Sequence, residues 1–398
     1  MFRLFANHAP LLQSSTEVTD QFCEGIALST DYPVVVYGAS GYTGRLVMEH
    51  LRELGVPFIA AGRNRQRVEE SLRLVPGVES ARYQIAEVEH SVTALRKLFA
   101  GRKVVCNTVG PFARYNLEVG EACLHEGLHY LDTTAEQHSI LQLEERFAAD
   151  FVKAGLVMIP SVAYMFAISE IGARHCLETP GVDSLRLHSI GTAVPTVASA
   201  QTIFDAVGRD SYYLKDRQLV RYPNIEVGKV CTPSGEVLMT SNWGGSPNPL
   251  WFRRDGRVRN CKSDVAMWNQ ELHKKELELE RLHKVQLQWI PADKLYPLLD
   301  HLAKSVAPAQ PPRESRQVHR SIDICLATGN NVAMKSTIFS TGGYLTTGAL
   351  QAYAACRLAS EVPRLTGLRS PSEVFGHREL IGALKSYGYA SIKLEQIV

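Results

Sequence analysis

Several features that would assign a protein to a special class are missing from this sequence of 398 residues. No uninterrupted apolar run approaches the roughly 20 residues that span a bilayer, which argues against a transmembrane helix. Basic and acidic residues are interspersed, and the formal net charge of +2 does not favour a nucleic-acid or membrane-surface partner. The chain has neither an internal repeat nor an extended low-complexity segment. With 45% hydrophobic residues, it has the composition of a globular protein with a large core.

Paired cysteines are also missing. The eight cysteines are scattered, and none lies in a C-x-x-C pair, so we interpret them as reduced, mostly buried thiols of a cytoplasmic protein. Residues 1–30 lack the apolar core of a secretory signal. We interpret this segment as an extension before the first strand, and the sequence leaves open whether it packs on the body of the protein or on a partner subunit.

The most informative segment runs from Val34 to Arg45 and predicts a buried strand that turns through three glycines into a helix. Gly38 would permit the tight turn, Gly41 would let the backbone approach a phosphate, and Gly44 would let the helix pack against the strand. The N-terminus of the helix would then bind a pyrophosphate through its free N–H groups. The spacing is G-x-x-G-x-x-G, so an ordinary strand-helix turn is the alternative. The predicted cofactor contacts in this segment are Gly38, Ser40, Gly41, Tyr42, Thr43 and Gly44.

A basic segment follows the second predicted strand, residues 57–61. Arg63 lies 19 residues after Gly44, and no Asp or Glu occurs between residues 55 and 68. An acidic residue near this position binds the ribose 2′-hydroxyl of NAD, whereas an arginine binds the 2′-phosphate of NADP. We therefore predict NADPH, with Arg63 stacking on the adenine and clamping the phosphate and with Asn64 and Arg67 as helpers. An exposed basic start of a helix is the alternative.

Strand and helix patterns alternate up to about residue 160 and predict an α/β fold with a Rossmann-type doubly wound parallel sheet. Beyond residue 183, strand-like runs without regular helical crossovers predict an antiparallel sheet in an inserted α+β domain. An alanine- and leucine-rich helix is expected to return the chain to the nucleotide domain. The predicted units are an N-terminal extension (1–30), an NADP-binding Rossmann domain (31–180), an α+β substrate or dimerisation domain (181–340) and C-terminal helices packing on the Rossmann domain (341–398).

Three motifs occur in order: residues 38–44, the strand end 61–64, and Val109-Gly110-Pro111-Phe112 with the residues up to Asp132. Together they resemble the saccharopine dehydrogenase-like oxidoreductases, and more closely the branch that contains trans-acting enoyl reductases. The resemblance covers about residues 32–160. It implies that the nicotinamide end of the cofactor lies near residues 109–112, at the carboxyl edge of the sheet. The expected contacts there are Thr108, Gly110 and Pro111, with a structural turn as the alternative.

The chain departs from the family pattern after the sixth predicted strand. Relatives often have Gly-x-Asp-Ser-x-Pro-Ser-Asp there, whereas residues 161–170 of this chain are mainly apolar and aromatic, which favours a substrate with an apolar portion. Tyr164 is the candidate proton donor, because reduction of a polarised double bond also requires a proton. Core packing is the alternative for Tyr164. Lys335 is a more speculative acid or ligand.

Two further segments are predicted to lie near the carboxyl edge of the sheet. The run from Gly191 and Thr192 through residues 199–202 resembles a cofactor-facing segment of relatives. Thr133 or Thr134 is expected to cap the next helix, with Glu136 in its first turn.

The leading interpretation is an NADPH-dependent oxidoreductase that reduces an activated C=C or C=N bond of a partly apolar small molecule in biosynthesis. The alternative is a non-catalytic NADP(H)-binding scaffold or redox sensor, in which residues 164–166 fill the cleft beside Gly110. The sequence is compatible with a homodimer and does not fix the oligomeric state.

Two other motifs are interpreted as chance matches. The segment from His125 to His129 matches H-E-x-x-H, but Gly127 is expected to end the helix and to separate the two imidazoles, so no metal is predicted. Tyr389 and Lys393 match the Tyr-x-x-x-Lys pair of short-chain dehydrogenases, far beyond the glycines.

Overall fold

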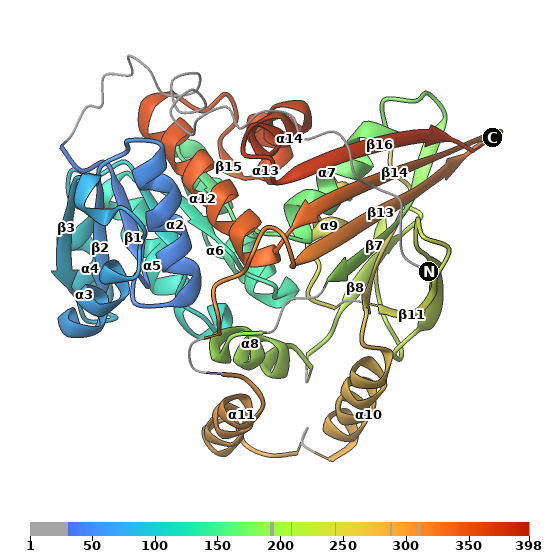
Figure 1. The fold of residues 1–398 in the computed structure, drawn as a ribbon, viewed down its shortest axis with the longest axis horizontal. Coiled ribbons are helices and arrows are strands. Elements are labelled where there is room, and N and C mark those ends of the chain that lie inside the picture. The colour runs from blue at the N-terminus through green and yellow to red at the C-terminus, as the bar shows by residue number, and fades with distance from the viewer. Residues whose placement is uncertain are drawn as a thin grey trace, which may run out of the picture.

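The computed structural model describes residues 31–397 except 192–194, 208, 243, 287–288 and 309–310. The predictions for residues 1–30 and for Thr192 lie outside these described residues. Two sheets lie side by side with helix α12 between them (Figure 1). None of the described helices is both long enough and apolar enough to cross a membrane.

The first sheet is parallel throughout, with the strand order β15-β6-β5-β4-β1-β2-β3. This order confirms the predicted Rossmann-type doubly wound sheet. Its strands are β1 (Val34–Tyr37), β2 (Phe58–Gly62), β3 (Tyr83–Glu87), β4 (Val104–Asn107), β5 (His129–Asp132), β6 (Val157–Ile159) and β15 (Gly367–Leu368). Its helices are α2 (Tyr42–Glu53), α3 (Arg65–Arg73), α4 (Val92–Phe99), α5 (Phe112–Glu126), α6 (Gln137–Lys153) and α12 (Gly343–Ser360), with a 3-10 turn at Val78–Ser80.

Both faces of this sheet are buried, as continuous apolar strands require. Val34 and Val36 pack in one core with side chains of α2, α3 and α12. Val35 and Tyr37 point to the opposite face and pack with side chains of α4, α5 and α6. The alternation of strand side chains therefore divides the core into two layers.

The second sheet is mixed. Its main path is β10-β11-β12-β7-β13-β14-β16, and the β8-β9 hairpin joins at β12. All of its pairs are antiparallel except β7 with β12, so the prediction of a purely antiparallel sheet misses one parallel pair. Its strands are β7 (Val182–Gly191), β8 (Tyr212–Lys215), β9 (Gln218–Arg221), β10 (Val227–Cys231), β11 (Val237–Asn242), β12 (Asn260–Met267), β13 (Arg320–Gly329), β14 (Val332–Thr341) and β16 (Ala390–Gln396).

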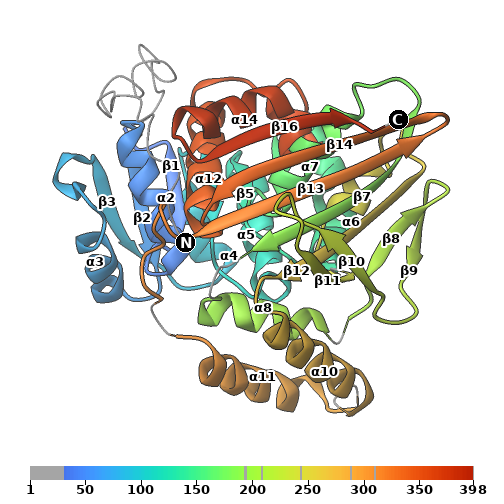
Figure 2. The same ribbon diagram turned by 45° about the vertical axis from the view of Figure 1, so that its right-hand side comes forward.

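Helices α7 and α14 pack against this second sheet, and α8, α10 and α11 lie together at one end of it (Figure 2). The helices are α7 (Phe166–Cys176), α8 (Val197–Val207), α9 (Asn248–Phe252), α10 (Gln270–Gln286), α11 (Ala292–Val306), α13 (Pro371–Phe375) and α14 (His377–Ser386). The C-terminal part of the chain differs from its prediction, because it is not only helical. Strand β15 extends the first sheet and β16 extends the second, which ties the two sheets together.

Six of the described cysteines are free thiols, and five of these are buried.

Candidate functional site

The glycine turn after β1 has the geometry that its spacing predicts. Gly38 adopts φ +96°, and its N–H donates to the Ala61 carbonyl at 3.0 Å. A Cβ on Gly44 would lie 2.5 Å from the Gly38 carbonyl oxygen and 3.0 Å from the Ala39 Cα. Only glycine therefore lets helix α2 begin this close to the strand.

The N-terminus of α2 presents its first amides at the carboxyl edge of the sheet. Gly41 is the N-cap, in extended conformation and without a side-chain cap. The first intrahelical bond runs from the Arg45 N–H to the Gly41 carbonyl at 3.0 Å, so the N–H groups of Tyr42, Thr43 and Gly44 have no partner in the helix. Because these N–H groups carry the positive end of the helix dipole, they are suited to bind an anion.

Tyr42 fixes a segment of the second domain over this helix. Its hydroxyl donates to the Pro312 carbonyl at 3.1 Å and accepts from the Glu314 N–H at 2.9 Å. Its ring packs edge-on against Tyr344, with centroids 5.1 Å apart. The Tyr344 hydroxyl lies 2.8 Å from the Ser199 Oγ, so the helix of the glycine turn contacts α12 directly and α8 through it.

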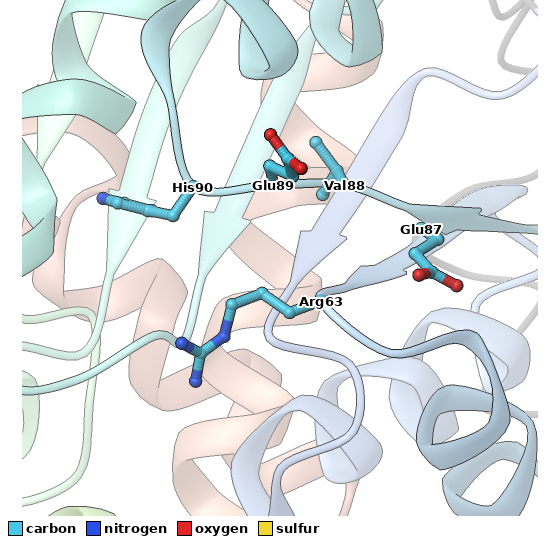
Figure 3. Close-up of a pocket in the computed structure, with 5 residues that line it drawn as sticks. All are labelled: Arg63, Glu87, Val88, Glu89 and His90. Carbon is cyan, nitrogen blue, oxygen red and sulfur yellow. The ribbon is translucent and has the colours of Figure 1, made fainter.

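Arg63 borders a pocket of about 360 Å³ at the end of β2. The other lining residues are Glu87, which ends β3, and the three residues after it, and Figure 3 shows the guanidinium extending away from Glu87. No ion pair joins Arg63 to another described residue. Burial raises the pKa of Tyr37 to about 12, and the positive charge of Arg63 acts in the opposite direction on that pKa. An exposed arginine without an ion partner beside a pocket is suited to an anion such as a ribose 2′-phosphate. The remaining lining residues are Val88, Glu89 and His90.

Asn64, one of the predicted helpers of Arg63, has another partner. The Asn64 Oδ1 accepts from the Arg67 N–H at 2.9 Å and caps α3. Asn64 therefore has a structural task that accounts for its position by itself.

The loop after β4 lies beside the glycine turn. The Thr108 N–H and hydroxyl both donate to the Tyr37 carbonyl, at 2.8 and 3.0 Å, and the hydroxyl lies 2.6 Å from where a Cβ on Gly38 would be. The Gly110–Pro111 peptide is cis. A Cβ on Gly110 would lie 3.4 Å from the Thr202 Oγ1 of α8. The structure therefore brings Thr108 and Gly110 to the carboxyl edge and places the predicted small-residue helix over them.

Two buried carboxyl groups hold this edge together. The Glu136 carboxylate accepts from the N–H groups of Phe112 at 2.9 Å and Ala113 at 2.8 Å, and so caps α5. Burial raises the pKa of Glu136 to about 7. Asp132 accepts from the N–H groups of Thr134 at 2.9 Å and Ser161 at 2.8 Å, and burial raises its pKa to about 6.

The capping prediction for this region is wrong in its details. Glu136 is itself the N-cap residue of α6, and no side chain caps that helix. The carboxylate reaches the neighbouring helix α5 instead, because the start of α5 offers free N–H groups.

Tyr164 lies in the loop between β6 and α7, where the two domains meet. A Cβ on Gly343, at the start of α12, would lie 2.6 Å from the Tyr164 Cδ1, and one on Gly191, at the end of β7, would lie 3.5 Å from its hydroxyl. The hydroxyl donates to the Ile190 carbonyl at 3.4 Å. Burial raises the pKa of Tyr164 well above its usual range, and the nearby Asp323 adds to this.

The loop that carries Tyr164 has an unusual backbone. Ser161 and Met165 adopt φ +60° and +59° although neither is glycine. Such conformations cost free energy and are often found at functional sites. These backbone conformations favour the functional role of Tyr164 as a proton donor. Its close packing favours the alternative role in the core.

Lys335 is not brought near the other candidates. It lies in the middle of β14, in register with Leu326 and Glu395. It lies six positions before Thr341, the end of that strand nearest α12, which corresponds to about 20 Å. Strand spacing therefore separates Lys335 from Tyr164, so the structure does not bring the two predicted catalytic residues together.

The two motif matches have the geometry expected of chance matches. Helix α5 ends at Glu126, and Gly127 adopts φ +73°. His129 lies in β5, where its Nδ1 accepts from the Val157 N–H at 3.1 Å. Tyr389 precedes β16 and bonds to His50, while Lys393 lies within that strand and pairs with Glu395. The two residues therefore do not form a Tyr-x-x-x-Lys pair on a helix.

Asp323 is a buried group that the sequence did not indicate. Its Oδ1 accepts from the hydroxyls of Ser169 at 3.0 Å and Ser189 at 2.6 Å, while its Oδ2 has no hydrogen-bond partner. Burial raises the pKa of Asp323 from the usual 3.8 to about 7. The residues come from β13, α7 and β7, so only the tertiary structure reveals the cluster, which lies close to Tyr164.

We expect Asp323→Asn to change the pH dependence of folding stability. Because the folded protein holds the Asp323 proton more tightly than the unfolded chain, this group stabilises the fold below about pH 4 and loses that contribution as pH rises to about 7. The loss is on the order of 2 to 4 kcal/mol. Asp323→Asn should remove this decrease in stability between about pH 4 and pH 7. Urea unfolding at several pH values measures the change.

Asp255→Asn provides the control. Burial of Asp255 is outweighed by hydrogen bonds from Arg257, which lower its pKa, so its own titration lies below pH 4. The Asp255 variant should keep the wild-type slope between pH 4 and pH 8. An unchanged slope for Asp323→Asn would contradict the prediction.

Comparisons with known proteins agree with this geometry. Residues 34–158 match the model described as the saccharopine dehydrogenase NADP-binding domain, and residues 167–395 match a family described as of unknown function (DUF5938). A trans-acting enoyl reductase of Mycobacterium tuberculosis is 32% identical over 246 residues, which cover 57% of this chain and 54% of that protein. One of Mycobacterium leprae is 34% identical over 109 residues, 27% of this chain and 26% of that protein.

The matched residues thus span about half the length of the first of these relatives. Among solved structures, the apo saccharopine dehydrogenase (L-Glu forming) of Saccharomyces cerevisiae covers 92% of this chain and 99% of its own, with a TM-score of 0.56 and 13% identity. This similarity supports the fold that the strand order already shows.

Proposed function

Because this chain belongs to the DUF5938 family and its first domain matches the saccharopine dehydrogenase NADP-binding domain, we propose that it is an NADPH-dependent oxidoreductase. Its proposed reaction is the reduction of an activated C=C or C=N bond in a partly apolar biosynthetic intermediate. The similarity to trans-acting enoyl reductases supports the first of these bond types. The single observation that carries the proposal is the glycine turn with an arginine at the end of β2.

The residues present fit the cofactor. The amides of Tyr42, Thr43 and Gly44 would hold the pyrophosphate, since the helix N-terminus leaves them free. Arg63 would hold the 2′-phosphate, and the pocket beside it would receive the adenosine end. Thr108 and Gly110 would border the nicotinamide end. Bound NADPH supplies a hydride to the substrate.

The protein would supply the proton. The Tyr164 hydroxyl donates to the Ile190 carbonyl and lies where the two domains meet. We propose it as the donor to the reduced substrate. The apolar side chains of Met165, in the same loop, and Phe166, the first residue of α7, would keep water away from the reacting atoms.

Arg63→Ala is the experiment that tests the cofactor assignment. Loss of a charge-assisted contact to the 2′-phosphate should weaken NADPH binding by about ten- to a hundredfold and change NADH binding little. Calorimetric titration of both cofactors measures this ratio. Arg65→Ala is the matched control, because Arg65 is also exposed and already bonds to Glu69 at 3.0 Å.

Equal weakening of both cofactors by Arg63→Ala would sink the 2′-phosphate assignment. Tight NADPH binding by the wild-type protein with no turnover across a panel of unsaturated thioesters and imines would favour the scaffold or redox-sensor alternative instead.

A further inference from the structure

A cluster of three potential metal ligands lies away from the cofactor site. His175 is in the last turn of α7, Glu178 follows that helix, and His377 is the first residue of α14. One ligand atom from each residue lies within 4.8 Å of the other two. The two histidines are 202 positions apart in the sequence, so only the packing of α14 on α7 brings them together.

His175 is the strongest part of this cluster. Its side chain is only 7% exposed, yet neither ring nitrogen has a hydrogen-bond partner among the described residues. An imidazole buried with both nitrogens unpaired costs free energy unless something binds it. The His377 ring stands at 89° to it with centroids 4.6 Å apart.

The other two residues are already preoriented. The His377 Nε2 lies 2.7 Å from the Glu178 Oε1, and both side chains are partly exposed, at 20% and 35%. Arg378 also binds Glu178, with its Nε at 2.9 Å from Oε1 and its Nη2 at 2.6 Å from Oε2. The carboxylate is thus fixed beside the histidines, with Arg378 competing for it.

We propose that His175, Glu178 and His377 form a Zn²⁺ site. Two imidazoles, one carboxylate and one water match the preferred ligands of zinc. With zinc-ligand bonds of about 2.0 to 2.1 Å, tetrahedral ligands lie about 3.4 Å apart. The present separations of up to 4.8 Å would therefore have to shorten by up to about 1.4 Å, which side-chain rotations can supply. The exposed edges of Glu178 and His377 give the ion access.

The proposed zinc site lies far from Tyr164, which indicates a structural role for the ion. Helix α7 has 11 residues, about 16 Å of helix, and Tyr164 lies just before its opposite end. Zinc would fasten the end of α7 to the start of α14 and would stabilise the second domain. It should leave NADPH binding unchanged, so this inference does not depend on the proposed function.

The test uses full-length protein without an affinity tag, after treatment with a chelator. Competition between the protein and a chromophoric chelator for ZnCl₂ should show one ion per chain, together with a higher melting temperature. His175→Gln and His377→Gln should each weaken zinc binding by about a hundredfold or more, since loss of even an outer-shell partner costs ten- to a hundredfold. Arg378→Gln should strengthen binding, because it removes the competitor for Glu178.

His125→Gln is the matched control. This substitution removes a histidine that lies 3.9 Å from a glutamate, Glu121, on a surface helix. The His125→Gln variant should bind zinc as the wild type does. If His175→Gln fails to fold, the partly exposed His377 keeps the test decisive. The site would be refuted by the absence of stoichiometric zinc binding, by unchanged binding in His377→Gln, or by loss of binding in His125→Gln.

Discussion

Tyr164→Phe should lower the turnover number by about a hundred- to ten-thousandfold, the usual contribution of a positioned general acid. The substitution removes only the hydroxyl, and the ring contacts with Gly343 should persist. Affinity for NADPH should therefore stay close to that of the wild type. Steady-state NADPH oxidation with an accepted substrate measures the turnover, and calorimetry measures the affinity.

Tyr353→Phe is the control for this substitution. Tyr353 is a buried tyrosine of helix α12. Its hydroxyl contacts Arg357 and Glu379 and does not face the carboxyl edge of the first sheet. The Tyr353 variant should keep wild-type turnover. Full activity of Tyr164→Phe would show that Tyr164 packs the domain boundary, and the proton would then have another source.

Gly44→Ala should abolish measurable NADPH binding, a loss we expect to exceed a hundredfold. The new Cβ would lie 2.5 Å from the Gly38 carbonyl and 3.0 Å from the Ala39 Cα. Both are backbone atoms, so α2 must shift away from β1, and its N–H groups leave the position that holds the pyrophosphate. The stability of the fold should fall as well, by about 1 to 3 kcal/mol. NADPH titration and urea unfolding measure the two effects.

Gly382→Ala is the matched control, because this glycine lies within helix α14 and an added Cβ would meet no atom within 4 Å. Alanine there should stabilise the protein by about 0.5 to 1 kcal/mol and leave NADPH binding unchanged. Wild-type affinity in Gly44→Ala would falsify the assignment of the glycine turn as the pyrophosphate site.

The sequence by itself determined the parts of this protein that depend on local geometry. The glycine spacing required a tight turn between a buried strand and a helix. Gly38 adopts the positive φ that this turn needs, and Gly44 occupies a position where a side chain would collide with backbone. Four apolar residues in a row required a strand covered on both faces. The basic residue at the end of β2 was likewise readable, because its distance from the glycines fixes its place at the carboxyl edge.

Only the tertiary structure decided which distant side chains meet. Glu136 caps α5 rather than its own helix, Asp323 joins serines from two other elements, and β16 pairs with β14 in the second sheet. His175 and His377 become neighbours for the same reason. Such contacts depend on how helices and strands pack, and packing is set by the shapes of whole surfaces rather than by the spacing of a few residues along the chain.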